Sequence, residues 1–575
     1  MLERIDLLIL FVYFVAVMAV GLLVSKKSSS SLGDYFLGGR SIPWYLLGIS
    51  GMATFLSLSG SMHIVSLYLL FGVKGFWIIL RGHMCLFLAF LMIFMAKWLN
   101  RSGAMTNAEW TIFRFGTGRQ GKAARLLSAV STLFVSIAIM AFFFVAAEKF
   151  LMQYIPLPPR ISALIFFGIV MIYTVAAGFH GVIYTDLFQS VLIVGVIGFI
   201  TFKAMTIGNI EYFNEFAASD WRSIMPQWKM DMPPGYESMN FFGILIIFWL
   251  ISNIFQGFAQ PTDGFVSQRY YAAKNERESS LIAWQWIVLL SMRFLMMTGI
   301  AVLALGITGS FNDPEKAFPA VIDHFFPAGL KGLVLSALIA AEMSSLDSIA
   351  NSSAAYVVKD IYQAFINPEA KDKTLVRVSY LATAGLFIIS ALIGMAAPNL
   401  DSIWAWTVMG LVTGLLPSGI LKWVWWRFNG AGYAAGVISG ISAAVLHTFI
   451  FDNPAEYVTF LFVLSVSAAG TVLGTFMGKP APMETMLSFY KTTRPFGFWG
   501  PVRKLCEPAI EMDIKRENRR DLLLLIPASL WQLTIFWIMT AIIVKRWDSV
   551  AISALVLTVL SAILYKYWYL NLKRD

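Results

Sequence analysis

The sequence predicts an all-α membrane protein with many spanning helices. Of its 575 residues, 58% are hydrophobic and only 13% are charged, whereas ordinary soluble domains are about a quarter charged. Apolar segments of about 20 residues, the length that crosses a bilayer as a helix, recur along the whole chain. Two of these segments are interrupted by glycine, and one of the two also by proline. Together these observations predict a polytopic helical bundle that contains broken helices.

We count about fifteen apolar segments and expect each to be one transmembrane helix. The first is long enough to span and lacks the basic region that precedes a cleavable signal. The last two flank only the short turn Lys545–Ser549, so the count rests mainly on the first thirteen. The segments cover residues 5–25, 44–71, 75–98, 123–154, 159–178, 184–206, 240–261, 281–305, 328–358, 376–397, 402–425, 430–450, 455–477, 522–545 and 549–570.

Basic residues are concentrated in every second connection between these segments. Cytoplasmic loops carry an excess of lysine and arginine, so the pattern predicts an outside N-terminus and, with fifteen spans, a cytoplasmic C-terminus. The short connections between the segments indicate a bacterial inner (plasma) membrane. The basic stretches are Lys97–Arg125, Gln268–Glu278, Lys359–Arg377, Lys422–Arg427 and Lys479–Arg520, and acidic or neutral ones such as Glu211–Glu237 and Phe451–Glu456 alternate with them.

The second and seventh segments are expected to be broken helices. The second contains Gly51 and Gly60 among small polar residues, and the seventh contains Gly257, Pro261 and Gly264. Unwound backbone inside a membrane is tolerated where it lines a cavity. Interrupted helices at corresponding positions of two halves indicate an inverted-repeat secondary transporter. The alternative is an ordinary proline kink with close glycine packing.

The stretch Ala337–Tyr362 is unusually polar for a membrane helix, and it contains both Glu342 and Asp347. Ionisable residues inside a membrane are costly and mark ion or substrate pathways. Hydroxyl groups without clustered cysteine or histidine suit a hard cation such as sodium. The alternative is that small polar residues merely allow close helix packing. The residues that share one helical face are Ala341, Ser344, Ser345, Ser348 and Ser352.

Several other function classes are disfavoured by the sequence. The two cysteines, Cys85 and Cys506, and the scattered histidines offer no catalytic or metal-binding constellation, so we expect no enzyme. The basic residues follow the topology pattern, which argues against a nucleic-acid partner. We find no Walker-type loop that would support an ATP-driven pump. A symporter-like membrane sensor remains an alternative, although the linker 478–521 is too short for a kinase domain.

Four stretches, in this order along the chain, resemble the sodium/solute symporter family, which includes sodium-coupled glucose, proline, pantothenate and sialic acid carriers. The resemblance covers roughly residues 5–477 and implies a leucine-transporter-like fold. Its core would be two inverted five-helix repeats formed by spans two to eleven, after one extra helix. The stretches are the small, polar second span ending in Gly72, IYTDLFQ (Ile183–Gln189), SQRYYAAK (Ser267–Lys274) and AAEMSSLDSIANSS with its trailing DIY (Ala340–Tyr362).

The resemblance divides the chain into five parts. Residues 1–43 would hold the extra helix and an inner loop, and 44–425 the ten-helix transport core. Residues 426–477 would add two helices, 478–521 a basic cytoplasmic linker, and 522–575 the C-terminal helices.

The resemblance also implies the ion sites. Asp347 stands where a hydroxyl residue is usual, so it strengthens sodium binding, carries a proton or pairs with an arginine. For Asp186 the alternative is a helix N-cap. For the two carbonyl ligands of the first core helix, a shift of the match by one residue along the sequence remains open. The first sodium site would comprise Ala53, Leu56, Ala341, Ser344 and Ser345, and a second one Asp186, Ser344, Asp347 and Ser348.

The expected function is sodium-coupled symport of a small polar solute by alternating access, with proton coupling as the alternative. Two arginines inside the membrane favour an organic anion or a zwitterion. Arg269 and Lys274, by contrast, are expected to lie on the inner loop and to serve membrane topology and packing. The candidate substrate residues are Ser57, Ser59, His63, Arg81, Asn253, Gln256, Gln260, Asp263 and Arg293. The expected partners are the solute, the sodium ion and the lipid bilayer.

Overall fold

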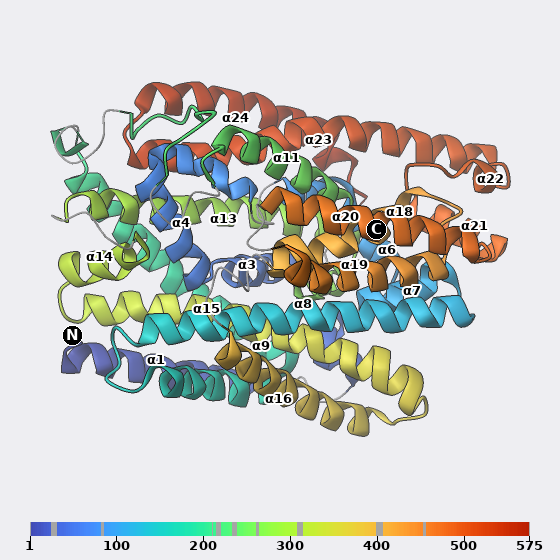
Figure 1. Ribbon diagram of the computed structural model, residues 1–575, viewed down its shortest axis with the longest axis horizontal. Helices are drawn as coiled ribbons and strands as arrows, with labels where there is room; N and C mark the ends of the chain where they lie inside the picture. Colours follow the sequence, from blue (N-terminus) through green and yellow to red (C-terminus); the bar gives the residue numbers. More distant parts are fainter. Residues whose placement is uncertain are drawn as a thin grey trace.

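The protein is a bundle of helices that lie side by side along its long axis (Figure 1). In the described part of the chain the only β-structure is an isolated bridge between Trp425 and Phe498. The prediction of an all-α fold is therefore confirmed. The computed structural model describes residues 2–24, 31–81, 86–209, 211–213, 220–232, 239–259, 264–307, 314–397, 406–451 and 456–573.

The first half of the chain contains the N-terminal helices and the first five core helices. The N-terminal part comprises α1 (Arg4–Val24), α2 (Leu32–Leu37) and the 3₁₀ turn η2 (Gly38–Arg40). The second predicted span, residues 44–71, is divided into α3 (Trp44–Phe55) and α4 (Leu58–Phe71). The third, residues 75–98, is divided among η3 (Gly72–Leu80), α5 (Phe87–Phe90), η4 (Leu91–Met95) and α6 (Ala96–Arg101). The short α7 (Asn107–Phe115), then α8 (Arg119–Leu151) and α9 (Pro159–Ile207), complete this half.

The second half contains the other core helices and the C-terminal additions. Its core elements are α11 (Phe242–Phe258), α12 (Gly264–Ala272), α13 (Glu276–Leu305), η6 (Pro314–Lys316), α14 (Ala317–Phe325), α15 (Leu330–Ala355), η7 (Tyr356–Ile366), α16 (Asp372–Ala396), η8 (Trp406–Val412) and α18 (Thr413–Val424). The additions are α19 (Gly430–Ile450), α20 (Glu456–Met477), α21 (Met483–Thr493), α22 (Gly500–Arg503), α23 (Pro508–Ile543), α24 (Trp547–Tyr567) and η9 (Tyr569–Asn571). Because α23 begins at Pro508, it includes the last residues of the stretch expected to be a linker.

Helix breaks occur where the sequence places glycine and small polar residues. Between α3 and α4 the chain leaves the helix at Leu56 and Ser57, and the Ser57 hydroxyl accepts a hydrogen bond from the Gly60 amide at 3.3 Å. Inside α9 the break is at Gly178, whose φ of 58° lies in the left-handed region that favours glycine. Asp186 lies two turns after that break, within the helix. The alternative interpretation of Asp186 as an N-cap is therefore wrong.

Helix α15 lies at the centre of the bundle. It packs against α9, α1, α3, α16 and α8, and nearly all of its residues are buried. Its first turn is held by the extra N-terminal helix, because Asp6 Oδ1 accepts the amides of Gly329 and Gly332 at 2.7 and 2.8 Å. A carboxylate at a helix N-terminus satisfies free amides and complements the helix dipole. The polar stretch of the sequence is therefore an interior helix, fixed at its start.

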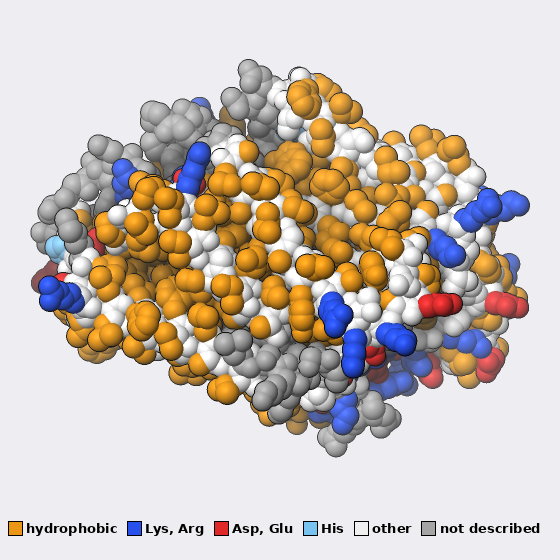
Figure 2. All heavy atoms as spheres, turned by 90° about the horizontal axis from the view of Figure 1, so that it is seen from below, with side chains coloured by type: hydrophobic (Ala, Val, Ile, Leu, Met, Phe, Trp, Pro, Cys, Tyr) orange, Lys and Arg blue, Asp and Glu red, His pale blue; other side chains and the backbone are white. Residues whose placement is uncertain are grey.

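The surface matches a membrane environment. In the described residues, thirteen helical stretches are long and apolar enough to cross a bilayer, and α11 is a shorter apolar helix. Figure 2 shows one face on which apolar side chains form a broad band, while lysine, arginine, aspartate and glutamate lie toward the two ends. Exposed side chains such as Phe11, Val191 and Leu381 contribute to the apolar surface. The protein is a multi-pass membrane protein.

Gly51 is required for close packing between α3 and α13. A Cβ atom at this position would lie 1.4 Å from the indole nitrogen of Trp286. We expect Gly51→Ala to lower the free energy of unfolding by about 1–3 kcal/mol, the usual cost of overpacking a core. Gly168→Ala is the matched control, because no atom lies within 4 Å of its added methyl group. Thermal unfolding in detergent would contradict this if both variants behaved alike.

Candidate ion and substrate sites

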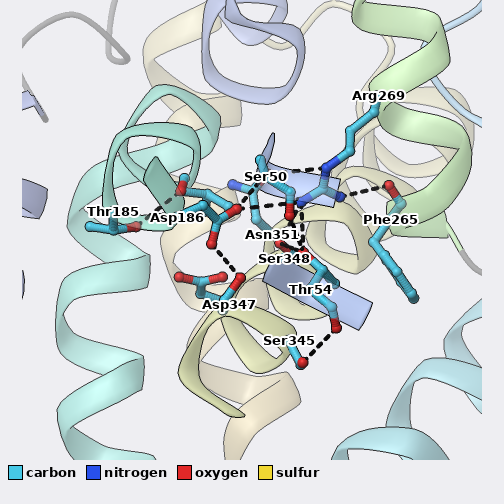
Figure 3. Close-up of polar contacts among 12 residues, drawn as sticks. Ser50, Thr54, Thr185, Asp186, Phe265, Arg269, Ser345, Asp347, Ser348 and Asn351 are labelled. Atoms are coloured by element: carbon cyan, nitrogen blue, oxygen red, sulfur yellow. Dashed lines mark hydrogen bonds and ion pairs between the residues drawn. The ribbon is translucent and has the colours of Figure 1, made fainter. Parts of the chain in front are cut away.

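The polar side chains of α15 contact polar side chains of α3, α9 and α12, as Figure 3 shows. Ser344, Ser345, Asp347 and Ser348 are all buried. They come together because the spacing of Ser344, Ser345 and Ser348 places these three on one helical face. The face expected from the sequence therefore meets other polar groups and not lipid.

A connected group of six side chains, here called the Arg269 cluster, joins four helices. Its members are Ser50, Thr54, Asp186, Arg269, Ser344 and Ser348. Asp186 accepts hydrogen bonds from the hydroxyls of Ser50 and Ser344. Arg269 Nη2 lies 3.5 Å from Asp186 Oδ2, and both side chains are fully buried. The same nitrogen donates to Ser50 Oγ at 2.6 Å, Ser348 Oγ at 2.8 Å and Thr54 Oγ1 at 2.9 Å (Figure 3).

The position of Arg269 differs from the expectation. The sequence predicts that this residue lies on the inner loop and serves membrane topology and packing. In the structure it lies on α12, and its guanidinium reaches the bundle interior. Lys274, from the same SQRYYAAK stretch, is exposed. The difference arises because, after α11 ends at Phe258, the chain forms a further buried helix, α12, which gives Arg269 access to Asp186. The sequence offered one signal for this, the short distance between the break and the arginine.

Asp347 lies beside the Arg269 cluster but has a separate hydrogen-bond partner. Its Oδ2 accepts the Tyr173 hydroxyl at 2.8 Å, and its Oδ1 has no hydrogen-bond partner among the described residues. The extra helix α1 covers this region, since the Tyr13 hydroxyl donates to Met343 Sδ at 3.3 Å and accepts from Gln189 Nε2 at 3.0 Å. Three of the four residues expected in a second sodium site are therefore joined through the cluster, and Asp347 borders it.

The break between α3 and α4 lies against α15 at Ser345. The Ser345 hydroxyl is 2.7 Å from the Thr54 carbonyl and 3.0 Å from the Ala341 carbonyl. The Ala53 carbonyl, one residue earlier, accepts the Leu56 amide at 3.2 Å within the last turn of α3. Among the described residues, no group of three histidine, cysteine, aspartate or glutamate side chains could hold a metal ion. The oxygens that meet at the break are the Ser345 hydroxyl and the carbonyls of Thr54 and Ala341.

Glu342 holds the start of α4. Its Oε2 accepts the Leu58 amide at 2.9 Å, and its side chain is buried. A carboxylate at a helix N-terminus is stabilised by the free amides and by the helix dipole. This contact fixes the second half of the broken helix against α15.

A cavity of about 150 Å³ opens beside the break. Four of the candidate substrate residues line it: Ser57, His63, Arg81 and Arg293. Asn253 and Gln256 do not line it. Asn253 Nδ2 donates to the carbonyls of Leu80 and Trp249, and Gln256 Nε2 donates to the Ser252 hydroxyl. Gln260, Asp263 and the side chain of Ser59 lie outside the described residues.

Arg81 is engaged in an ion pair at the edge of this cavity. It pairs with Glu456 at the start of α20, and its Nη1 lies 3.0 Å from His63 Nε2. Trp249 Nε1 also donates to Glu456 at 3.4 Å. The pair therefore links the core to one of the added helices.

The comparison with known proteins decides the family. The model of the sodium:solute symporter family matches residues 35–440, which include both interrupted spans, the Arg269 cluster and every described residue of the cavity lining except Phe536. This chain belongs to the sodium:solute symporter family.

The relatives of this symporter are cotransporters. It is 29% identical over 553 residues to a sodium/glucose cotransporter of Vibrio parahaemolyticus, covering 86% of this chain and 95% of that protein. It is 27% identical to the human sodium/myo-inositol cotransporter over 68% of this chain and 58% of the relative. In fold it is similar to a Na⁺-coupled sialic acid symporter, with a TM-score of 0.66 at 22% identity, covering 84% of this chain and 99% of that one. The expected leucine-transporter-like fold is confirmed.

The function follows from the family. The symporter is a secondary active transporter that couples movement of a small solute to sodium, and it is not an enzyme. Sodium is thus a transported substrate of this protein. Sequence reasoning found the serine stripe but missed Arg269 and Tyr173, since neither residue is close in sequence to the helix it contacts.

Proposed function

We propose that the symporter binds its sodium ion where the break of the first core helix meets α15. The ligands would be Ala341, Ser344 and Ser345 on α15 with the carbonyls of Ala53 and Leu56. The contact from Ser345 to the Thr54 carbonyl at 2.7 Å supports this location and favours Thr54 over Ala53 as the first carbonyl. The change from Ala53 to Thr54 is the shift of one residue that the sequence analysis left open.

The Arg269 cluster would couple this ion to the neighbouring helices. Ser344 belongs to the proposed sodium site and also donates to Asp186, which is paired with Arg269. The guanidinium already provides a cation beside Asp186 and Ser348, two residues of the proposed second site. A second sodium ion would therefore have to share those oxygens with Arg269, and Asp347 is the other carboxylate of the proposed second site.

Transport would follow from differential binding. A sodium ion that bridges α3, α4 and α15 stabilises the arrangement in which these segments meet, and this arrangement also forms one wall of the cavity. Such coupling between two ligands is reciprocal and typically about 1–3 kcal/mol. Alternating access would then be a movement of one helix set against the other, driven by the sodium gradient.

The symporter would lie in the plasma membrane with the N-terminus outside and the C-terminus inside. Lysine and arginine side chains gather at the end of the molecule that carries α7 and α21 (Figures 1 and 2), which supports a cytoplasmic location for that end. The five parts of the chain would keep the roles given above, with residues 44–425 as the transport core. The solute would be an organic anion or a zwitterion.

The test is thermal unfolding of the purified symporter in detergent, titrated with sodium chloride against potassium and choline chloride at constant ionic strength. A ligand of the folded state stabilises it by about 2.7 kcal/mol at a hundredfold excess over its Kd. We expect sodium alone to raise the unfolding temperature of the wild type. We expect Ser345→Ala to lose that rise, because a hydroxyl ligand is removed.

Ser336→Ala is the matched control. Ser336 lies on the same helix, is equally buried, and donates only to the Gly332 carbonyl one turn earlier, so its variant should keep the sodium response. If sodium acts like potassium on the wild type, the sodium site is rejected. A response that persists in Ser345→Ala would reject the proposed ligands alone.

A further inference from the structure

Helix α23 contributes to the wall of the cavity, although it lies outside the part of the chain that matches the family. That match ends at residue 440, whereas α23 spans Pro508–Ile543. Among the described residues, Phe536 is the one member of α23 that lines the cavity, and its side chain is buried. The wall is therefore completed by one of the C-terminal additions.

Aromatic contacts hold Phe536 at the cavity. Its ring centre lies 4.8 Å from that of Phe294 on α13, with 29° between the two ring planes, and Phe294 also lines the cavity. The Phe294 ring is in turn 5.8 Å from Phe76 on η3, and Phe76 lies 5.5 Å from Trp537, the neighbour of Phe536. Aromatic rings attract one another in offset and edge-on arrangements at such separations. These contacts attach this turn of α23 to both α13 and η3.

The same face of α23 covers the line along which α4, η3 and α13 meet. One turn after Phe536, the Thr540 hydroxyl lies 3.4 Å from the hydroxyls of Tyr68 on α4 and Thr298 on α13. Elsewhere around the helix, Leu523 and Leu530 are exposed and belong to the apolar outer surface. Helix α23 therefore separates the cavity from the outer surface of the bundle along this line.

The Phe536 ring takes up a large share of a small space. The cavity volume of about 150 Å³ is comparable to that of a cavity which accommodates a benzene ring. In an apolar pocket, a difference of one methylene group changes discrimination by about 10–200-fold. A phenyl ring in the wall is much larger than a methylene group. Its presence should therefore decide which apolar groups fit.

We propose that Phe536 contacts the apolar part of the transported solute and limits its size. The proposal rests on the sodium-coupled transport proposed above and names a further specificity-determining residue for the same cavity. It gives α23, a helix beyond the family match, a direct part in selecting the solute.

The first experiment measures whether a water-soluble reagent reaches position 536. Cys85 and Cys506 are replaced by alanine, and Phe536→Cys or Ala528→Cys is then introduced. Ala528 is the matched control, because it is buried on the same helix and does not line the cavity. The probe is hydroxyethyl methanethiosulfonate, which is uncharged, and its addition is followed by mass spectrometry. We expect Phe536→Cys to react about tenfold faster or more, since a thiol buried in packed protein reacts only after local opening.

The labelling rates are compared in sodium chloride and potassium chloride at equal ionic strength. We expect the rate for Phe536→Cys to differ between the salts, because sodium shifts the populations of the states that open the cavity. The proposal is overturned if Phe536→Cys reacts no faster than Ala528→Cys in both salts. Equal rates for Phe536→Cys in the two salts would also overturn it if sodium stabilises the wild type. If sodium does not stabilise the wild type, the sodium site fails, and the rates in potassium still test the wall.

The second experiment tests the size limit with a reporter thiol. In the same background, Leu290→Cys places a thiol in the cavity wall on α13, and the hydroxyethyl reagent is compared with the bulkier benzyl methanethiosulfonate. We expect Phe536→Ala to raise the rate of the benzyl reagent, relative to the small one, by about tenfold. Phe536→Trp should lower this ratio.

Phe476→Ala is the control for the loss of a ring, because the Phe476 side chain is 61% exposed on α20, so the ratio should stay unchanged. Phe536→Leu is measured beside Phe536→Ala, since it keeps more of the buried apolar surface and is more certain to fold. Thermal unfolding of every variant identifies a loss of fold. A ratio that stays the same in folded Phe536→Leu, Phe536→Ala and Phe536→Trp would overturn the size limit.

Discussion

Replacing Arg269 by methionine is expected to lower the free energy of unfolding by about 3–5 kcal/mol, the usual effect of removing one partner of a buried ion pair. Asp186 would keep its buried charge without the guanidinium, and three hydroxyl groups would lose a donor. The measurement is unfolding in detergent, followed by heat and by denaturant. We also expect the sodium response to weaken, because Ser344 is held by Asp186.

Two controls make this prediction specific. Lys274→Met removes a cation from the same sequence stretch, but Lys274 is exposed, so the free energy of unfolding should change by less than about 0.5 kcal/mol. The double variant Arg269→Met with Asp186→Asn should recover part of the loss, since the uncompensated carboxylate is then absent. A loss in Arg269→Met no larger than in Lys274→Met would show that the buried pair contributes little.

Replacing Glu517 by glutamine is expected to have the second largest effect on stability. Glu517 lies on α23 and forms ion pairs with Lys97 at 3.4 Å, Arg101 at 2.7 Å and Arg494 at 3.2 Å. Asp521 and Glu276 still pair with Lys97 and Arg101 in the variant. We therefore expect a loss of about 3 kcal/mol, at the lower end of the range for a broken buried pair.

The ion pairs of Glu517 connect the C-terminal helix α23 to α6 and to the end of α21. Glu507→Gln is the matched control, because Glu507 pairs with Lys491 at 3.0 Å while its side chain is 69% exposed, and exposed pairs contribute about 0–1 kcal/mol. Unfolding temperatures of the two variants in detergent should differ clearly. Equal values would mean that α23 is held mainly by its apolar contacts with α13.

The fold could be predicted from the sequence to a large extent. The fifteen apolar segments all overlap helical stretches of the described residues. The second span is interrupted at Leu56 and Ser57, between its two glycines, and the helix of the seventh ends at Phe258, just before Pro261 in the sequence. These features are local, since length, hydropathy and a glycine or proline determine them within about 20 residues. The N-cap alternative for Asp186 fails for a local reason as well, because the break lies at Gly178, well before this residue.

The candidate site was predictable only in part. The serine stripe of α15 follows from helical spacing, and the family resemblance indicated that it would meet the first core helix. The partners of the ionisable residues could not be predicted in the same way. Glu342 caps α4, Asp347 accepts from Tyr173, and Arg81 pairs with Glu456, which is 375 residues away in the chain.

The sequence by itself determined that this protein is a helical membrane protein with one unusually polar helix, because hydrophobicity and periodicity are properties of short stretches. Its interrupted helices and its resemblance to the symporter family indicated a transporter. Only the tertiary structure decided that Arg269 faces Asp186, that Phe536 of α23 lines the cavity, and that Asn253 and Gln256 do not line it. The physical reason is that a buried charge needs a partner nearby in space. Helices distant in the sequence supply that partner, and only their packing determines which side chains meet.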